Sequence, residues 1–200
     1  MLKQLLKNKE FLKIIRVFLE KPEIVDIILF GSSIRGKDTP EDIDLLVVYS
    51  REEIIDINYE LRKKLEGINK NIEVIGKRYE DIFKPEFVAR EAILSEGFSF
   101  RQKNFISRGF GYDNFILFRY SLKGFNKSRR MQFYYSLYGR GNMEGLLKKS
   151  NSNKFSDSII LCPIENSELI KDFFEKLKIK FVQSPILIPN RTIKYLVKRD

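Results

Sequence analysis

The 200-residue sequence contains no histidine and only one cysteine, Cys162. A single cysteine excludes an internal disulfide framework. Without histidine, neither a cysteine–histidine zinc site nor a histidine general base can form. Any catalysis must therefore depend on carboxylates, hydroxyls, lysine or arginine side chains, or a metal ion held by oxygen atoms.

The sequence also lacks a long apolar run. No apolar stretch approaches the ~18 residues that a membrane-spanning helix requires. The first twenty residues alternate lysine with apolar residues and do not resemble a signal peptide. With 43% apolar and 32% charged residues, the composition is typical of a soluble globular chain with one sizeable core or two small domains. We therefore expect a cytoplasmic protein with no membrane partner.

Acidic residues are scarce in the second half of the chain. Residues 1–100 hold 17 Lys and Arg against 19 Asp and Glu, whereas residues 101–200 hold 20 against 8. Between residues 101 and 154, 12 basic residues accompany only Asp113 and Glu144. Such asymmetry points to a binding partner. We expect a first domain at residues 1–100 and a basic lobe at 101–200 that binds nucleic acid or another partner.

Strands alternate with helices in the first half, which indicates an α/β architecture. Apolar spacing predicts helices at 2–20, 51–66 and 86–96, and short β-branched runs predict strands at 24–30, 43–49 and 71–75, the last ending at Gly76. In the second half we expect helices at 113–123, 127–138 and 167–177, strands at 158–162 and 181–188, and a flexible or ligand-ordered loop at 140–157. This lobe is expected to be smaller and α+β.

A glycine and a serine follow the first predicted strand. Gly31 allows the backbone to approach a ligand closely, and Ser32 adds a hydroxyl. Small residues that follow a strand and open a turn present N–H groups suited to phosphate. Arg35 adds positive charge, which serves either a phosphate or an ion pair with Asp38 or Glu41.

Two carboxylates, Asp42 and Asp44, flank Ile43 at the start of the second predicted strand. Residues i and i+2 of a strand point to the same face, so both carboxylates lie together while Ile43 enters the core. Like charges at this spacing repel each other unless a cation lies between them. Mg²⁺ bound by carboxylates and by substrate phosphates meets that need.

The combined motif resembles the signature of a known family. Phe-Gly-Ser-x-x-Arg-Gly followed by Asp-Ile-Asp-Leu is similar to the signature of the nucleotidyltransferase fold of the DNA polymerase beta superfamily, including its minimal nucleotidyltransferases. The resemblance covers roughly residues 20–100. It implies a mixed sheet with flanking helices, in which Gly31 and Ser32 bind a nucleoside triphosphate (NTP).

The resemblance also implies a two-metal Mg²⁺ site. In the family, the aspartate pair holds the metals, and a carboxylate on a later strand helps to activate the attacking hydroxyl. By position Glu73 matches that third carboxylate, although the family more often has aspartate there. The expected catalytic and metal-binding residues are therefore Asp42, Asp44 and Glu73, and the nucleotide-binding residues are Gly31, Ser32 and Arg35.

Aromatic residues accompany the basic residues between 101 and 154. Cations neutralise phosphates and flat rings stack on unpaired bases, so nucleic acid is the expected partner. The resemblance favours RNA, because related transferases often act on RNA. The candidate nucleic-acid-binding residues are Lys123, Lys127, Arg129, Arg130 and Arg140.

The alternative interpretation is that these rings belong to the hydrophobic core and do not bind nucleic acid. More than half of the aromatic side chains are expected in the core, because two groups fit single helical faces: Phe115, Phe118 and Leu122, and Met131, Tyr134, Tyr135 and Tyr138.

Three functions are consistent with these observations. The first is Mg²⁺-dependent transfer of a nucleoside monophosphate from an NTP to a hydroxyl acceptor on RNA. The second is a catalytically quiet scaffold that binds RNA or a ribonucleoprotein such as the ribosome. The third is an antitoxin-like protein that binds and adenylylates a toxin partner.

Overall fold

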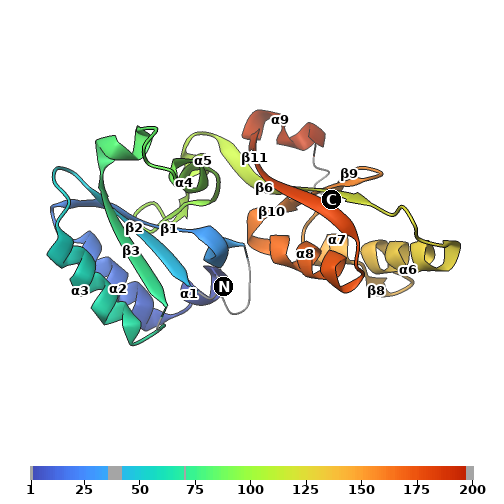
Figure 1. Ribbon diagram of the computed structural model, residues 1–200, viewed down its shortest axis with the longest axis horizontal. Helices are drawn as coiled ribbons and strands as arrows, with labels where there is room; N and C mark the ends of the chain where they lie inside the picture. The colour runs from blue at the N-terminus through green and yellow to red at the C-terminus, as the bar shows by residue number, and fades with distance from the viewer. Residues whose placement is uncertain (1, 36–41, 70, 197–200) are drawn as a thin grey trace. The chain divides into compact units, whose positions relative to one another are not determined.

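The structure is a computed structural model that describes residues 2–35, 42–69 and 71–196. It divides into two compact units, residues 1–110 and 111–200, each of which is described by itself (Figure 1). The sequence placed the boundary between residues 100 and 101. The first unit continues beyond that point because Asn104–Phe105 pairs with Phe98–Ser99 in the first sheet.

The first unit contains a sheet with helices on both faces. Its elements are α1 (Leu2–Leu5), α2 (Lys9–Leu19), β1 (Ile24–Phe30), the 3₁₀ turn η1 (Gly31–Ile34), β2 (Ile43–Tyr49), α3 (Ile55–Glu66), β3 (Ile72–Arg78), η2 (Tyr79–Phe83), α4 (Arg90–Glu96), β4 (Phe98–Ser99), β5 (Asn104–Phe105) and α5 (Ile106–Gly109). The strand order is β3-β2-β1-β4-β5, with β2 and β3 parallel and the other pairs antiparallel. This mixed sheet with flanking helices confirms the predicted fold class.

Strand β2, which lies between β3 and β1, is buried on both faces. Leu46 and Val48 pack with Ile93 of α4. The Tyr49 hydroxyl instead donates a hydrogen bond to Asn58 of α3, at 2.7 Å. Even-numbered residues of β2 therefore face α4, and odd-numbered residues face α3, which lies with α2 on the other side of the sheet (Figure 1).

Two local predictions for the first unit were wrong. The helix predicted at 2–20 is divided into α1 and α2 because the Asn8 side chain caps α2, accepting a hydrogen bond from the Phe11 amide at 3.0 Å. The strand predicted to end at Gly76 continues to Arg78. A Cβ at Gly76 would overlap the side chains of Asn58, on α3, and Glu53, so the glycine leaves room for these side chains against the sheet.

The second unit is an antiparallel sheet with helices. Its elements are β6 (Tyr112–Ser121), α6 (Lys127–Tyr138), β7 (Gly139–Arg140), β8 (Met143–Glu144), α7 (Leu146–Lys149), β9 (Asn153–Ser156), β10 (Ile159–Pro163), η3 (Ile164–Asn166), α8 (Ser167–Lys176), β11 (Lys180–Pro189) and α9 (Asn190–Leu196). The main sheet has the order β11-β6-β10-β9, and β7 and β8 form a separate hairpin. The segment at 140–157, predicted as a loop, thus contains three short strands and a helix.

The helix predicted at 113–123 was wrong, because this segment forms strand β6. Phe118 packs against Phe174 of α8, with ring centres 5.9 Å apart, whereas Phe115 joins a cluster with Ile193 of α9. The strand is thus buried on both faces, and a continuous apolar run cannot be assigned to a helix or a strand by periodicity alone.

Among the helices in residues 2–35, 42–69 and 71–196, none has the length and apolar character needed to cross a membrane.

Candidate active site

The end of β1 places Gly31 against the carboxylate of Asp44. Phe30, the last residue of β1, is paired with Asp44 in the antiparallel register of β1 and β2. Gly31 follows with a φ of +74°, and a Cβ at this position would overlap Oδ2 of Asp44. Only glycine allows both this conformation and this close approach. The backbone that begins the turn therefore lies in direct contact with a candidate catalytic carboxylate.

The turn η1 holds one hydroxyl without a partner. Ser33 anchors the turn, because its Oγ donates a hydrogen bond to the Phe30 carbonyl at 3.1 Å and its side chain is buried. Ser32 Oγ is also buried but has no hydrogen-bond partner within the described ranges. A buried hydroxyl without a partner is unfavourable in the free protein. A ligand that bonds to Ser32 would remove that cost.

Glu73 lies beside Asp44 on the neighbouring strand. The two residues are direct partners in the parallel register of β2 and β3. Asp44 shares the face of Leu46, and Glu73 shares that of Ile75, which packs on the same apolar cluster. Ile43 is fully buried on the opposite face, as the alternation predicts, and the exposed Asp42 precedes it.

These carboxylates repel one another. The pKa of Asp44 is raised to about 6, first by burial of its carboxyl group and then by the negative charges of Asp42 and Glu73. Asp42 and Glu73 are themselves exposed. Asp44 thus carries a charge at neutral pH that its surroundings disfavour, and a cation would stabilise that charge.

The donor set has the chemistry that Mg²⁺ requires, because every candidate ligand is a carboxylate or hydroxyl oxygen. The side chains do not form a finished metal centre: among the parts of the chain that the structure describes, no three Asp, Glu, Cys or His side chains lie close enough together to hold an ion. Asp42, Asp44 and Glu73 therefore form an acidic edge at the amino-terminal ends of β2 and β3 rather than a closed set of ligands.

Arg35 is bound to a buried carboxylate that the sequence analysis missed. Its Nη2 and Nε atoms lie 2.7 and 3.2 Å from the two carboxylate oxygens of Glu96, the last residue of α4. Only 2% of the Glu96 side chain is exposed. No local sequence signal marks Glu96, because its partner is 61 residues away in the chain. The ion pair connects the end of η1 to α4. The phosphate role of Arg35 stays a prediction, and Asp38 and Glu41, its other expected partners, lie outside the described residues.

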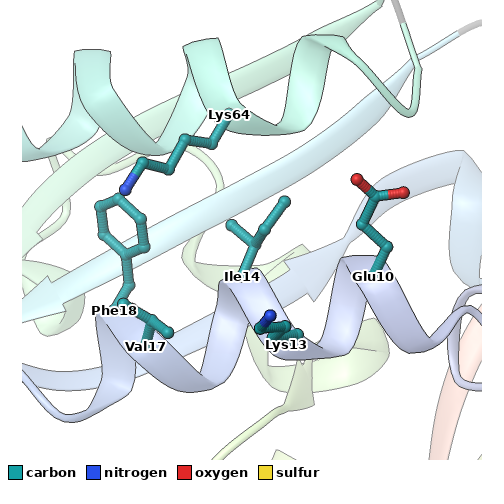
Figure 2. A pocket seen from close by; sticks show the side chains of 6 residues that line it. All are labelled: Glu10, Lys13, Ile14, Val17, Phe18 and Lys64. Carbon is teal, nitrogen blue, oxygen red and sulfur yellow. The ribbon is translucent and has the colours of Figure 1, made fainter.

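A cavity of about 230 Å³ lies elsewhere in the first unit, between α2 and α3 (Figure 2). Figure 2 shows Lys64 of α3 extending over the ring of Phe18 on α2, with its Nζ 5.4 Å from the ring centre. Helices α2 and α3 cover the face of the sheet opposite to Asp44. This cavity is therefore separate from the acidic edge.

The five candidate nucleic-acid-binding residues all lie in the second unit and are exposed. Two of them are engaged with the protein's own backbone. Arg129 donates to the Leu177 carbonyl at 2.6 Å and lies over the Phe125 ring, and Arg130 donates to the Phe125 carbonyl at 3.1 Å. Lys123 lies in the turn before α6, and Lys127 begins α6. The nucleic-acid roles of all five, including Arg140 of β7, stay predictions.

The aromatic residues of the second unit are distributed differently from the prediction. Phe133 and Leu137 form the buried face of α6. Met131 and Tyr135 are each 41% exposed, and Tyr138 is 48% exposed. The prediction that these three residues lie in the core was therefore wrong.

Residues 12–96 match the family described as Polymerase beta, Nucleotidyltransferase. The matched segment begins within α2, ends with Glu96 and contains the turn η1 and all three carboxylates of the acidic edge. A search of curated proteins finds no match to the chain. Residues 12–96 thus form a nucleotidyltransferase domain with the fold of the polymerase beta superfamily, and the resemblance seen in the sequence is confirmed.

Proposed function

We propose that the protein is a Mg²⁺-dependent nucleotidyltransferase that moves a nucleoside monophosphate from an NTP to a hydroxyl group of an RNA. One observation carries the proposal: the Asp44 carboxylate is in register with Glu73 and in contact with Gly31, at the head of a turn that holds the unpartnered hydroxyl of Ser32. An acidic edge next to the Ser32 hydroxyl, which has no partner among the described residues, is suited to a substrate that carries both phosphates and a bound cation.

Each part of the site has a role in this reaction. The backbone of Gly31 and the hydroxyl of Ser32 bind the β- and γ-phosphates, and Asp42 and Asp44 hold Mg²⁺. A Mg²⁺ ion held by these aspartates would supply the positive charge that phosphoryl transfer requires. Glu73 orients the acceptor hydroxyl and takes its proton. The acceptor oxygen then forms a bond to the α-phosphorus as the bond to the pyrophosphate oxygen breaks, and pyrophosphate leaves.

The test is a labelling reaction with the full-length protein. It is incubated with Mg²⁺, total cellular RNA and each α-³²P-labelled NTP in turn, alongside the Asp42→Asn/Asp44→Asn variant. Label on RNA that requires both aspartates supports the proposal and identifies the nucleotide. Label on a co-purifying protein would replace it with the antitoxin-like function.

A catalytically quiet RNA-binding protein is the second candidate. The observation that favours it is the incomplete metal centre, since the described carboxylates do not come together as a set of three. RNA binding without any incorporation of label, at several Mg²⁺ concentrations, would establish this alternative in place of the enzyme.

A further inference from the structure

Helix α6 presents tyrosine rings to solvent on one face. At 100° per residue, Lys127, Met131, Tyr135 and Tyr138 lie on one side of the helix, and the buried Phe133 lies on the other. We call these four exposed residues, together with Arg140 of the adjacent hairpin, the α6 tyrosine face. Large exposed rings gathered on one helix are uncommon on a surface that has no ligand.

The hairpin β7–β8 positions Arg140 over this face. Gly139 has a φ of +91°, and a Cβ there would overlap the Met143 carbonyl and lie 2.7 Å from the Gly145 amide nitrogen. The chain therefore turns tightly at the end of α6. This turn places the Arg140 guanidinium 4.8 Å from the centre of the Tyr135 ring. The guanidinium thus lies over the Tyr135 ring and forms a cation–π contact with it.

The acidic residues near the face are paired with lysines. Lys154, whose Nζ lies 6.0 Å from the centre of the Tyr138 ring, is paired with Asp157 at 2.6 Å. Helix α6 contains three basic residues and no acidic residue. The nearest acidic residue in sequence, Glu144 of β8, is already paired with Lys148 at 2.8 Å. A polyanion would approach this face without meeting an uncompensated carboxylate.

We infer that the α6 tyrosine face is a docking surface for single-stranded RNA. Unpaired bases stack on the exposed parts of the Tyr135 and Tyr138 rings, and the adjacent phosphates contact Lys127 and Arg140. Tyr138 itself stacks on Tyr134, with ring centres 6.1 Å apart, so a base on Tyr138 would extend an existing stack. The exposed rings are tyrosines, whose hydroxyls remain hydrated, and not the leucine, phenylalanine and tryptophan that insert into a lipid surface. Base-paired RNA would not offer its base faces to the rings. The inference locates the acceptor of the proposed transfer reaction and rests on that proposal only for the acceptor role.

Arg129 and Arg130 are not part of the α6 tyrosine face, because they have a structural role. Both guanidinium groups donate to backbone carbonyl groups of the second unit, so part of their hydrogen-bonding capacity is used within the protein. We therefore expect the rings to contribute more to RNA affinity than these two arginines do.

The experiment measures binding of a fluorescein-labelled 12-nucleotide oligo(U) to the full-length protein by anisotropy, in EDTA and without NTP. Tyr135→Ala/Tyr138→Ala should weaken binding about tenfold for each ring, whereas Tyr135→Phe/Tyr138→Phe should bind within about twofold of wild type, because stacking remains. Lys127→Gln/Arg140→Gln should reduce the slope of log affinity against log salt by about 1.4, from two contacts of about 0.7 each.

Three controls separate the causes of any loss. Tyr59→Ala/Tyr79→Ala removes two exposed tyrosines from the first unit and should leave affinity unchanged. Circular dichroism checks that each variant is folded. Asp44→Asn should bind the RNA as wild type does, so failure of catalysis and failure of docking are distinguishable.

Several results would overturn the inference. These are unchanged affinity after removal of both rings, a larger loss on Arg129→Ala/Arg130→Ala than on ring removal, tighter binding of a 12-base-pair duplex or of oligo(dT), or tighter binding of vesicles that contain phosphatidylserine. Equal affinity across salt concentrations would also overturn it, because a phosphate-binding surface depends on salt.

Discussion

The candidate functional groups of the two units differ in sign of charge and in how they are held. In the first unit, Asp44 is half-buried beside two other carboxylates, and its pKa is raised to about 6. In the second unit, Lys127 and Arg140 are exposed, and helix α6 contains no acidic residue. The carboxylates of the acidic edge therefore repel one another in the folded protein, and a bound cation would reduce that repulsion. The exposed cations on and next to α6 experience less repulsion, so substituting them should have small effects on stability.

The sharpest test of this contrast removes the charge of Asp44. Asp44→Asn should lower the rate of nucleotide transfer about a thousandfold or more, because a neutral amide cannot replace a carboxylate that holds the cation. The rate of label incorporation measures it. The matched control is Asp172→Asn on α8, which removes an exposed aspartate from the second unit and should leave the rate unchanged. Equal losses in the two variants would contradict the placement of the site.

The next largest effect concerns the contact between Gly31 and Asp44. Gly31→Ala should lower the free energy of unfolding by about 2 kcal/mol or more, since the methyl group adds a clash to the strain of a positive φ. Urea unfolding measures the loss. Gly124→Ala is the matched control, because Gly124 also has a positive φ, +88°, but has no heavy atom within 4 Å of an added Cβ. Similar losses at both positions would show that the contact with Asp44 adds nothing.

Loss of the ion pair between Arg35 and Glu96 should also lower the stability of the protein. Glu96→Gln leaves the guanidinium without its buried counter-charge, so we expect a loss of about 2 kcal/mol, less than for a fully buried pair because Arg35 is one-third exposed. Thermal unfolding measures it. Glu66→Gln, which removes the partner of the exposed cations Arg62 and Lys63, should cause a loss of less than about 1 kcal/mol. Loss of activity together with stability would support a role for Glu96 in positioning η1.

The raised pKa of Asp44 predicts a pH dependence of stability in the metal-free protein. The stability that this group contributes is complete well below its ordinary pKa of 3.8, where folded and unfolded states are both protonated. It is lost as the pH rises to about 6, because the unfolded state ionises first. Asp44→Asn should therefore be more stable than wild type by about 1 kcal/mol at pH 7, after discounting for solvent exposure, and equal to it at pH 3.5. Unfolding in EDTA at both pH values checks this. A wild type as stable as the variant at pH 7 would contradict it.

The smallest effects on stability are expected for substitutions of the basic residues of α6. Arg129→Ala should lower stability by about 1 kcal/mol, because it removes the hydrogen bond to the Leu177 carbonyl and the contact with Phe125. Lys127→Ala, two residues earlier on the same helix, should be neutral. Denaturant unfolding monitored by circular dichroism compares the two. A greater loss of stability for Lys127→Ala than for Arg129→Ala would contradict the assignment of a structural role to Arg129 alone.

Local sequence signals were sufficient for much of the first unit. The strands at 24–30 and 43–49 were predicted with the bounds that the structure has, since short β-branched runs between Pro22, Gly31 and polar residues leave few alternatives. The alternation of Asp42, Ile43 and Asp44 predicted which side chain is buried. The motif around Gly31 also identified the nucleotidyltransferase domain, because a motif consists of residue types at a fixed spacing and can be read directly from the sequence.

Other features depend on neighbours that are distant in sequence. The segment at 112–121 satisfies both helical and strand patterns, and only the partners β10 and β11 make it a strand. Gly76 lies within a strand because Asn58 and Glu53 fill the space beside it.

What the sequence by itself determined is the identity of the acidic and basic groups and the local path of the chain near Gly31. Only the tertiary structure decided that Glu96 binds Arg35 and that Tyr135 and Tyr138 face solvent. The physical reason is that burial and charge pairing depend on which elements pack together. A side chain's own neighbours in sequence do not carry that information.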